Sequence, residues 1–213
     1  MKLEDLKRLY LSRKADIEKR INEFEEEWKN RSNEDIFAEL AFCLLTPQSK
    51  AKACWKAIED MCRDGVLLKG SEKEIARYLK NVRFGNNKAR YIVLARKIFT
   101  KHGKLEIKNF LQAFNDPKEI REWLVRNVKG LGYKEASHFL RNIGMGKEFA
   151  ILDRHILKNL KALGIIDSIP KSMTRRKYLE IEEKMRGLAE RLDIPLSHLD
   201  LLLWSKETGE IFK

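Results

Sequence analysis

The sequence has few cysteines, and their spacing makes no structural site. Cys43, Cys54 and Cys62 are its three cysteines, and no C-x-x-C pair occurs. An odd, unpaired set of this kind excludes a disulfide framework and a zinc or iron–sulfur ligand set. We expect a protein of a reducing cytoplasm.

Long apolar runs are also lacking. No stretch approaches the ~20 apolar residues that a membrane-spanning helix requires. The N-terminal stretch M-K-L-E-D-L-K-R is charged and has no apolar core of the kind that a signal peptide carries. We therefore predict a cytoplasmic protein without a targeting signal or membrane contact.

Acidic residues are fewer than basic residues in this sequence. The chain has 44 Lys and Arg residues against 32 Asp and Glu residues, a net charge of +12 and a pI near 9.6. This balance favours a polyanionic partner, and nucleic acid is the first candidate. The alternative is a generally Lys- and Glu-rich surface, as in many heat-stable proteins.

Strand patterns are missing too, because no period-2 run or β-hairpin signal stands out. Helical spacing recurs almost throughout, and capping patterns stand at Ser32, Ser71, Asp116–Pro117 and Asp153. We predict an all-α fold in a single domain, residues 1–213. R-F-G-N-N-K-A-R-Y, around Gly85, is predicted as a loop, with two lobes before and after it and a cleft between them.

Two glycines interrupt the helical pattern at Gly130 and Gly132. They allow a tight turn at about residues 128–133 whose amide N–H groups lie beside a helix N-terminus. Such a turn suits a DNA phosphate, with Lys129 and Lys134 nearby. V-K-G-L-G-Y-K-E-A resembles the helix-hairpin-helix motif. An ordinary helix corner with glycines at a C-cap is the alternative.

Lys134 and Asp153 are the candidate catalytic pair. An amine among positive charges and helix N–H dipoles loses its proton more easily, as a nucleophilic lysine requires. A carboxylate such as Asp153 can stabilise the oxocarbenium character that develops at C1′ when an N-glycosidic bond breaks. Alternatively, Lys134 only binds phosphate and Asp153 only caps a helix.

Several motifs together resemble the helix-hairpin-helix DNA glycosylase superfamily, and within it the type-2 8-oxoguanine DNA glycosylase/AP lyase family. They are L-L-T-P-Q-S, F-G-N-N-K-A-R-Y-I, G-L-G-Y-K-E-A-S-H-F-L-R-N, A-I-L-D-R-H and L-D-L-L-L-W-S-K-E-T-G-E-I-F-K. The resemblance implies that Lys134 forms a Schiff base and that Asp153 is the catalytic carboxylate. Lys129 departs from the proline that relatives often carry. No cysteine follows Cys62, so we expect no iron–sulfur cluster.

The resemblance further implies a monomeric base-excision repair enzyme. It would excise 8-oxoguanine from double-stranded DNA, cleave abasic sites by β-elimination, need no cofactor and lie with the nucleoid. The rivals are a non-catalytic helix-hairpin-helix DNA-binding module and a histidine-metal hydrolase. The four histidines lack H-x-x-x-H spacing, so we expect no metal.

The remaining pocket candidates each have a plainer alternative. The resemblance implies that Gln48 enters the vacated base stack, although it could be a simple turn residue. His138, one turn after Lys134, could line the base pocket or bond within the helix packing. Trp204 could stack on a base and Asp200 could accept a base N–H, or both could belong to the core. The resemblance assigns lesion discrimination to Lys213. Lys88 and Arg90 could contact phosphates or form a solvated loop.

Overall fold

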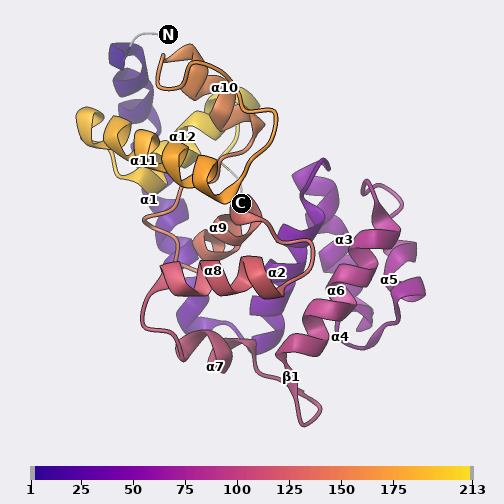
Figure 1. Ribbon diagram of the computed structural model, residues 1–213. Helices are drawn as coiled ribbons and strands as arrows, with labels where there is room; N and C mark the ends of the chain where they lie inside the picture. Colours follow the sequence, from indigo (N-terminus) through magenta and orange to yellow (C-terminus); the bar gives the residue numbers. More distant parts are fainter. Residues whose placement is uncertain (1–2, 212–213) are drawn as a thin grey trace.

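The computed structural model describes residues 3–211 and is almost entirely helical (Figure 1). The helices and strands, in chain order, are α1 (Leu3–Asn30), α2 (Asn33–Leu45), α3 (Ala51–Arg63), α4 (Val66–Lys69), α5 (Glu72–Tyr78), α6 (Gly85–Phe99), β1 (Thr100–Lys101), β2 (Lys104–Leu105), α7 (Ile107–Gln112), α8 (Pro117–Asn127), α9 (Tyr133–Asn142), α10 (Arg154–Ala162), α11 (Arg175–Leu192) and α12 (Leu196–Thr208). The predicted all-α class is confirmed.

Helix starts follow local hydrogen bonds that the sequence predicts. Ser32 and Asp35 form a reciprocal capping box at α2, and Ser71 and Glu74 form another at α5. Asp116 accepts from the N–H of Lys118, with Pro117 at the first helical position of α8. These caps satisfy backbone N–H groups that have no partner within the helix.

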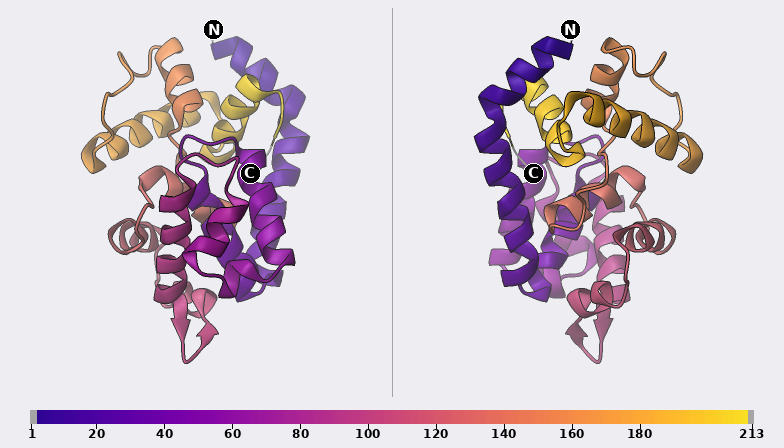
Figure 2. Two further views of the ribbon diagram at one scale, coloured as in Figure 1. Left: turned by 90° about the vertical axis from the view of Figure 1, so that its right-hand side faces the viewer. Right: turned by 90° about the vertical axis from the view of Figure 1, so that its left-hand side faces the viewer.

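Two hydrophobic cores divide the chain into two lobes, although not at the predicted place. One core takes its buried residues from α2 to α9 and ends at Phe149, and we call this part the middle lobe. The other joins α1 to α10, α11 and α12, and we call it the terminal lobe. The predicted division at Gly85 is wrong, because α1 contributes its buried residues to the core of the C-terminal helices and packs chiefly against α12 (Figures 1 and 2).

The predicted Gly85 loop is also wrong. Phe84 adopts a left-handed conformation with φ of 60°, and α6 begins at the next residue. The chain after Gly85 is therefore helical, and it carries Lys88 inward to a buried position. The irregular connection between α5 and α6 therefore covers residues 79–84 and ends at Phe84, so most of the predicted loop is helix.

The structure also contains a two-stranded antiparallel hairpin, β1–β2, that the sequence did not predict. Thr100 pairs with Leu105 and Lys101 with Lys104, while His102 and Gly103 turn with φ of 49° and 75°. Two positive φ values in succession are typical of the tightest hairpin turn. The strands are two residues long, which is too short for an alternating pattern to be visible.

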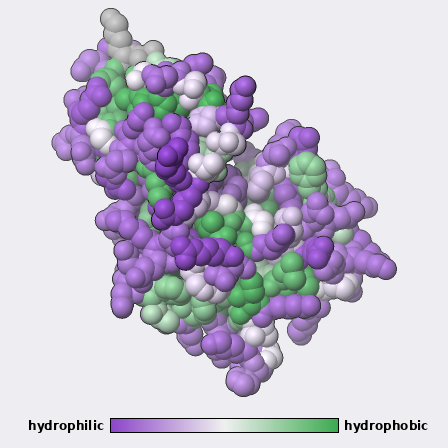
Figure 3. Space-filling model, viewed as in Figure 1, coloured by the Kyte–Doolittle hydropathy of each residue, from purple (hydrophilic) through white to green (hydrophobic). Residues whose placement is uncertain are grey.

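Hydrophilic residues cover most of the face in Figure 3, and its outline is indented where the two lobes meet. Among residues 3–211, no helix is long and apolar enough to cross a membrane.

Candidate active site

The glycine turn between α8 and α9 is the centre of the candidate site. Gly130 has φ of 89°, a conformation that side chains rarely adopt. A Cβ on Gly130 would lie 2.3 Å from a ring carbon of Tyr91 on α6, so packing also requires glycine there. Leu131 between the two glycines is buried and anchors the turn. Lys129 is exposed beside it.

Gly132 is the N-cap of α9 and has no side chain to fill that position. No side chain of the N-cap residue therefore covers the first N–H groups of α9, as an anion site at a helix N-terminus requires. The carboxylate of Glu135 lies beside this end, since its Oε2 is 3.0 Å from where a Cβ on Gly132 would stand. No motif in the sequence marks Glu135 as part of the site.

Lys134 is the second residue of α9, directly after the turn. Its side chain is 23% exposed, and its Nζ lies 3.0 Å from Oε1 of Glu135. The preceding residue, Tyr133, donates a hydrogen bond of 2.7 Å to Glu122 of α8. The start of α9 is therefore tied to α8, while the Lys134 side chain stays partly exposed.

Asp153 is the N-cap of α10. Its Oδ1 accepts from the backbone N–H groups of His155 and Ile156, both at 2.8 Å. Within residues 3–211 these are the hydrogen bonds of this carboxylate, so Oδ2 is available for another partner. The predicted cap is confirmed, and capping does not use the carboxylate fully.

The charge of Asp153 acts on a buried ion pair that involves α9. Arg141, on that helix, donates to Asp200 of α12 at 2.7 Å. Burial raises the pKa of Asp200 to about 6, Arg141 opposes the rise, and the negative charge of Asp153 adds to it. Burial lowers the pKa of Arg141, and the Asp200 and Asp153 carboxylates oppose that effect. The Asp153 carboxylate therefore acts electrostatically on a residue of the helix that presents Lys134.

Gln48 is exposed on the turn between α2 and α3, with φ of 55°. The buried Lys88 holds this turn, because its Nζ donates to the carbonyls of Leu45 and Pro47, each at 2.7 Å, and to Ser49 Oγ at 3.0 Å. The suggested phosphate contact of Lys88 is thus wrong. Its three partners lie about forty residues away in the chain, so no local sequence pattern indicates this role.

The turn of Gln48 is joined to the turn of Phe84. The N–H of Arg83 donates to Ser49 Oγ at 3.0 Å. Phe84 is 52% exposed, and the guanidinium of Arg83 lies 5.1 Å from the centre of its ring. Two left-handed residues on neighbouring turns therefore display an amide and an aromatic ring. The composition of its motif predicts a loop and gives no sign that Phe84 is displayed in this way.

His138 and Asp200 are buried, whereas Trp204 is half-buried on α12. His138 meets Phe42 edge-on, with ring centres 5.6 Å apart. Asp200 accepts from the N–H of Ile151 at 3.2 Å as well as from Arg141. In the structure, Asp200 thus accepts hydrogen bonds from two groups of the protein itself. Its predicted hydrogen bond to a base stays a prediction.

The predicted role of Lys213 concerns a residue outside the described part of the chain. The described end of the tail reaches the middle lobe, because Glu210 Oε1 lies 2.7 Å from Lys52 Nζ on α3. In the part of the chain from residue 3 to 211, no three His, Cys, Asp or Glu side chains gather as metal ligands. The expectation of no metal stays a prediction.

Comparison with known proteins gives one consistent result. The family model for 8-oxoguanine DNA glycosylase matches residues 17–194. An 8-oxoguanine DNA glycosylase/AP lyase of Fusobacterium nucleatum is 47% identical over 209 residues, covering 98% of this chain and 96% of the relative. One of Methanocaldococcus jannaschii is 46% identical over 214 residues, covering 100% and 98%.

Solved structures agree with this. A crystal structure of the Methanocaldococcus jannaschii 8-oxoguanine glycosylase/lyase in complex with 15mer DNA containing 8-oxoguanine superimposes with a TM-score of 0.89. It is 43% identical, and the match covers 99% of each chain. The 8-oxoguanine DNA glycosylase of Thermotoga maritima gives a TM-score of 0.88 at 36% identity, covering 99% and 98%.

Proposed function

The chain belongs to the 8-oxoguanine DNA glycosylase family, and on that premise we propose that it excises 8-oxoguanine from DNA and then cleaves the strand as an AP lyase. One observation carries the proposal: a partly exposed lysine, Lys134, follows directly on a glycine turn that places no capping side chain over the N-terminus of α9. A phosphate bound at that turn would bring the adjoining sugar to the amine.

We propose that Lys134 is the nucleophile. Nζ first gives a proton to Glu135, whose Oε1 lies 3.0 Å away. The neutral Nζ then bonds to C1′ as the bond between C1′ and the base breaks, and the base leaves with a proton. Opening of the sugar ring gives a protonated imine between Nζ and C1′. Loss of a proton from C2′ then expels the 3′ phosphate by cleavage of the C3′–O bond. Water hydrolyses the imine and returns the free amine.

Asp153 serves the first of these steps in our proposal. Cationic character develops at C1′ before the new bond is complete, and a fixed carboxylate stabilises it. The two N–H groups that bind Oδ1 hold Asp153 in place, while Oδ2 can face the sugar. Fixing the charged group in advance avoids reorganisation during the reaction, which is the main advantage of such a site.

DNA recognition in this proposal uses the two joined turns. An enzyme that acts on one base of a duplex must turn that base out of the stack. Gln48 would fill the space left behind, and Phe84 would stack on a neighbouring base. Both residues stand on turns braced by Lys88 and Ser49. The proposed contacts of the base are His138, Trp204, Asp200 and Lys213. The proposed contacts of the phosphate are Lys129, Gly130 and Gly132.

Lys134 and Asp153 both come from one chain, so we propose that the protein acts as a monomer. We further propose that it needs no cofactor or iron–sulfur cluster and that it acts on the DNA of the nucleoid.

Product analysis tests the function. A duplex with one 8-oxoguanine should yield the free oxidised base, a 5′-phosphate end and a 3′ unsaturated aldehyde, while an unmodified duplex should stay intact. Recovery of the lesion duplex uncut, with no base released, would refute the proposal.

A further inference from the structure

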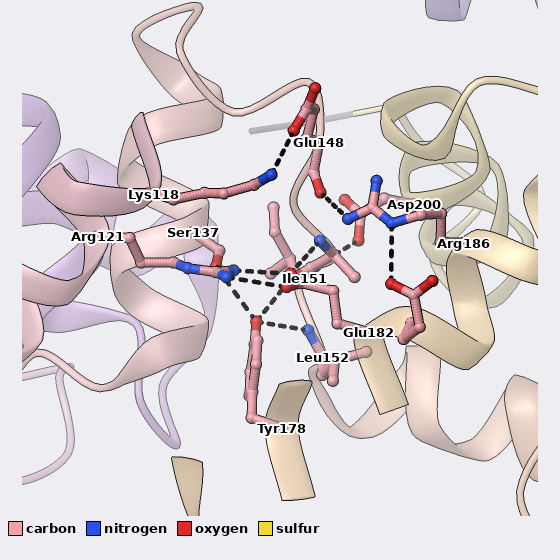
Figure 4. Close-up of polar contacts among 12 residues, drawn as sticks. Lys118, Arg121, Ser137, Glu148, Ile151, Leu152, Tyr178, Glu182, Arg186 and Asp200 are labelled. Atoms are coloured by element: carbon pink, nitrogen blue, oxygen red, sulfur yellow. Dashed lines mark hydrogen bonds and ion pairs between the residues drawn. The ribbon is translucent and has the colours of Figure 1, made fainter. Parts of the chain in front are cut away.

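The segment from Ala150 to Leu152 leads directly into Asp153, and buried side chains bind its backbone. The N–H of Ala150 donates to Glu182 Oε1 at 3.0 Å, and the N–H of Leu152 donates to the hydroxyl of Tyr178 at 3.4 Å. The same hydroxyl donates to the carbonyl of Ala150 at 2.5 Å. Side chains from α11 thus form hydrogen bonds with the backbone of this segment, as the backbone of a neighbouring strand does in a sheet (Figure 4).

The binding side chains are connected to α8, the helix that leads into the glycine turn. Arg121 of α8 donates to both carboxylate oxygens of Glu182, at 2.7 and 2.9 Å. Its guanidinium also lies 4.1 Å from the ring centre of Phe149, immediately before the segment. Arg121 additionally donates to Ser137 of α9 at 3.2 Å. One buried cluster therefore contacts α8, α9, α11 and the segment before Asp153 (Figure 4).

Stability alone is a weak reason for such a cluster. Both members of the Arg121–Glu182 pair are about 95% buried, with side-chain exposures of 5% and 6%. The cost of removing two charges from water offsets most of their attraction, so apolar residues of similar size would stabilise the lobes as well. A bidentate pair does, however, fix the distance and orientation of the parts that it joins.

We propose that Tyr178 and the Arg121–Glu182 pair are positioning residues, which hold Ala150–Leu152 so that Asp153 faces the sugar bound at Lys134. The inference rests on the proposed role of Asp153. Two contacts of the Tyr178 hydroxyl lie within three residues of that carboxylate. A shift of about 1 Å in a reacting group lowers a rate about 100-fold, so small losses of order should be measurable.

Tyr178→Phe is the sharpest test, because it removes one hydroxyl and keeps the ring that packs in the core. Burial raises the pKa of Tyr178, so its hydroxyl stays protonated and donates to Ala150 throughout the assay range. Single-turnover excision of 8-oxoguanine should slow roughly tenfold. Affinity for the lesion duplex and borohydride trapping at a preformed abasic site should change by less than about twofold, because neither requires cleavage of the glycosidic bond.

Tyr10→Phe is the matched control. Tyr10 is also buried in the terminal lobe, and its hydroxyl lies 2.9 Å from Nδ1 of His198, on another pair of helices. This variant should excise at the wild-type rate. Glu182→Gln is a second test, since it keeps an acceptor for the Ala150 N–H but removes the charge that faces Arg121. It should also slow excision selectively.

Asp153→Asn separates the inference from the function on which it rests. If Asp153→Asn blocks excision while Tyr178→Phe and Glu182→Gln excise normally, the positioning role is refuted and the role of Asp153 stands. Equal losses in excision, affinity and trapping for Tyr178→Phe would also refute positioning, because they indicate a general structural defect. Normal excision by Asp153→Asn would refute both. Selective slowing by both α11 variants supports the inference.

Discussion

Arg141 Nη1 lies 2.7 Å from Asp200 Oδ2, and both side chains are buried between the two lobes. The partnership does not fully offset the cost of burying the carboxylate. The pKa of Asp200 rises from 3.8 to about 6, chiefly through burial and against the effect of Arg141. A buried acid of this kind should make stability depend on pH in the direction opposite to that of a surface salt bridge.

Asp200 should destabilise the fold as the pH rises. Between about pH 4 and pH 6 the native protein holds a proton on Asp200 that the unfolded chain has released, so unfolding becomes easier with rising pH. Relative to Asp200→Asn, the wild type should lose up to about 3 kcal/mol across this range. Urea titrations at four pH values measure the difference. Parallel stability curves for the two proteins would contradict this prediction.

Gly130→Ala should damage the glycine turn in two ways. Alanine is strained at φ of 89°, and its Cβ would collide with Tyr91. We expect a loss of about 3 kcal/mol in unfolding free energy and weaker DNA binding. Gly164→Ala is the matched control, since Gly164 has φ of 70° but open space around its Cβ position. It should cost about 1 kcal/mol and leave DNA binding intact. Equal costs for the two variants would argue against the Tyr91 contact.

Lys88→Met should act through the Gln48 turn and not through DNA charge. The substitution keeps a long side chain but leaves two carbonyls and Ser49 without their donor, which should cost about 3 kcal/mol. The dependence of DNA affinity on salt should keep its slope, because a buried lysine releases no counterion. Arg90→Met, on the exposed face of α6, is the control for a surface cation. If DNA affinity depended less steeply on salt in Lys88→Met than in the wild type, Lys88 would have to be a phosphate contact.

Gln48→Ala and Phe84→Ala should affect duplex DNA more than single strands. Both side chains are proposed to fill or cover the stack after the base has turned out, and a single strand has no such stack to repair. Each variant should excise 8-oxoguanine from a duplex roughly tenfold more slowly, since stacking contributes about 1–3 kcal/mol per base. Excision from the single strand of the same sequence serves as the internal control. Equal slowing on both substrates would remove the proposed role.

The sequence predicted what depends on neighbours along the chain. Ser32 with Asp35, Asp116 with Pro117, and Asp153 with the N–H of Ile156 are all bonded within three residues, so their patterns are visible in the letters. The glycine turn and Lys134 follow each other directly. The candidate catalytic residues were therefore within reach of sequence reasoning, aided by a family resemblance.

Contacts between distant residues were out of reach. Lys88 meets Leu45 forty-three residues away, and Arg141 meets Asp200 fifty-nine residues away. Nothing local distinguishes Lys88 and Arg141 from surface cations, so sequence alone predicts a loop position for Lys88 and leaves Asp200 free to bind a base. The return of α1 to pack against α12 also has no local signal, which is why the lobes were divided wrongly.

Borohydride trapping tests the central claim most directly. Borohydride reduces an imine between Lys134 and C1′ to a stable amine, which joins protein and DNA covalently. The wild type and Lys129→Gln, a control that removes an exposed lysine from the same turn, should both be trapped on an 8-oxoguanine duplex. Lys134→Gln should fold and bind DNA but give no trapped complex. A trapped complex with Lys134→Gln, or none with the wild type, would contradict the assignment of Lys134 as the nucleophile.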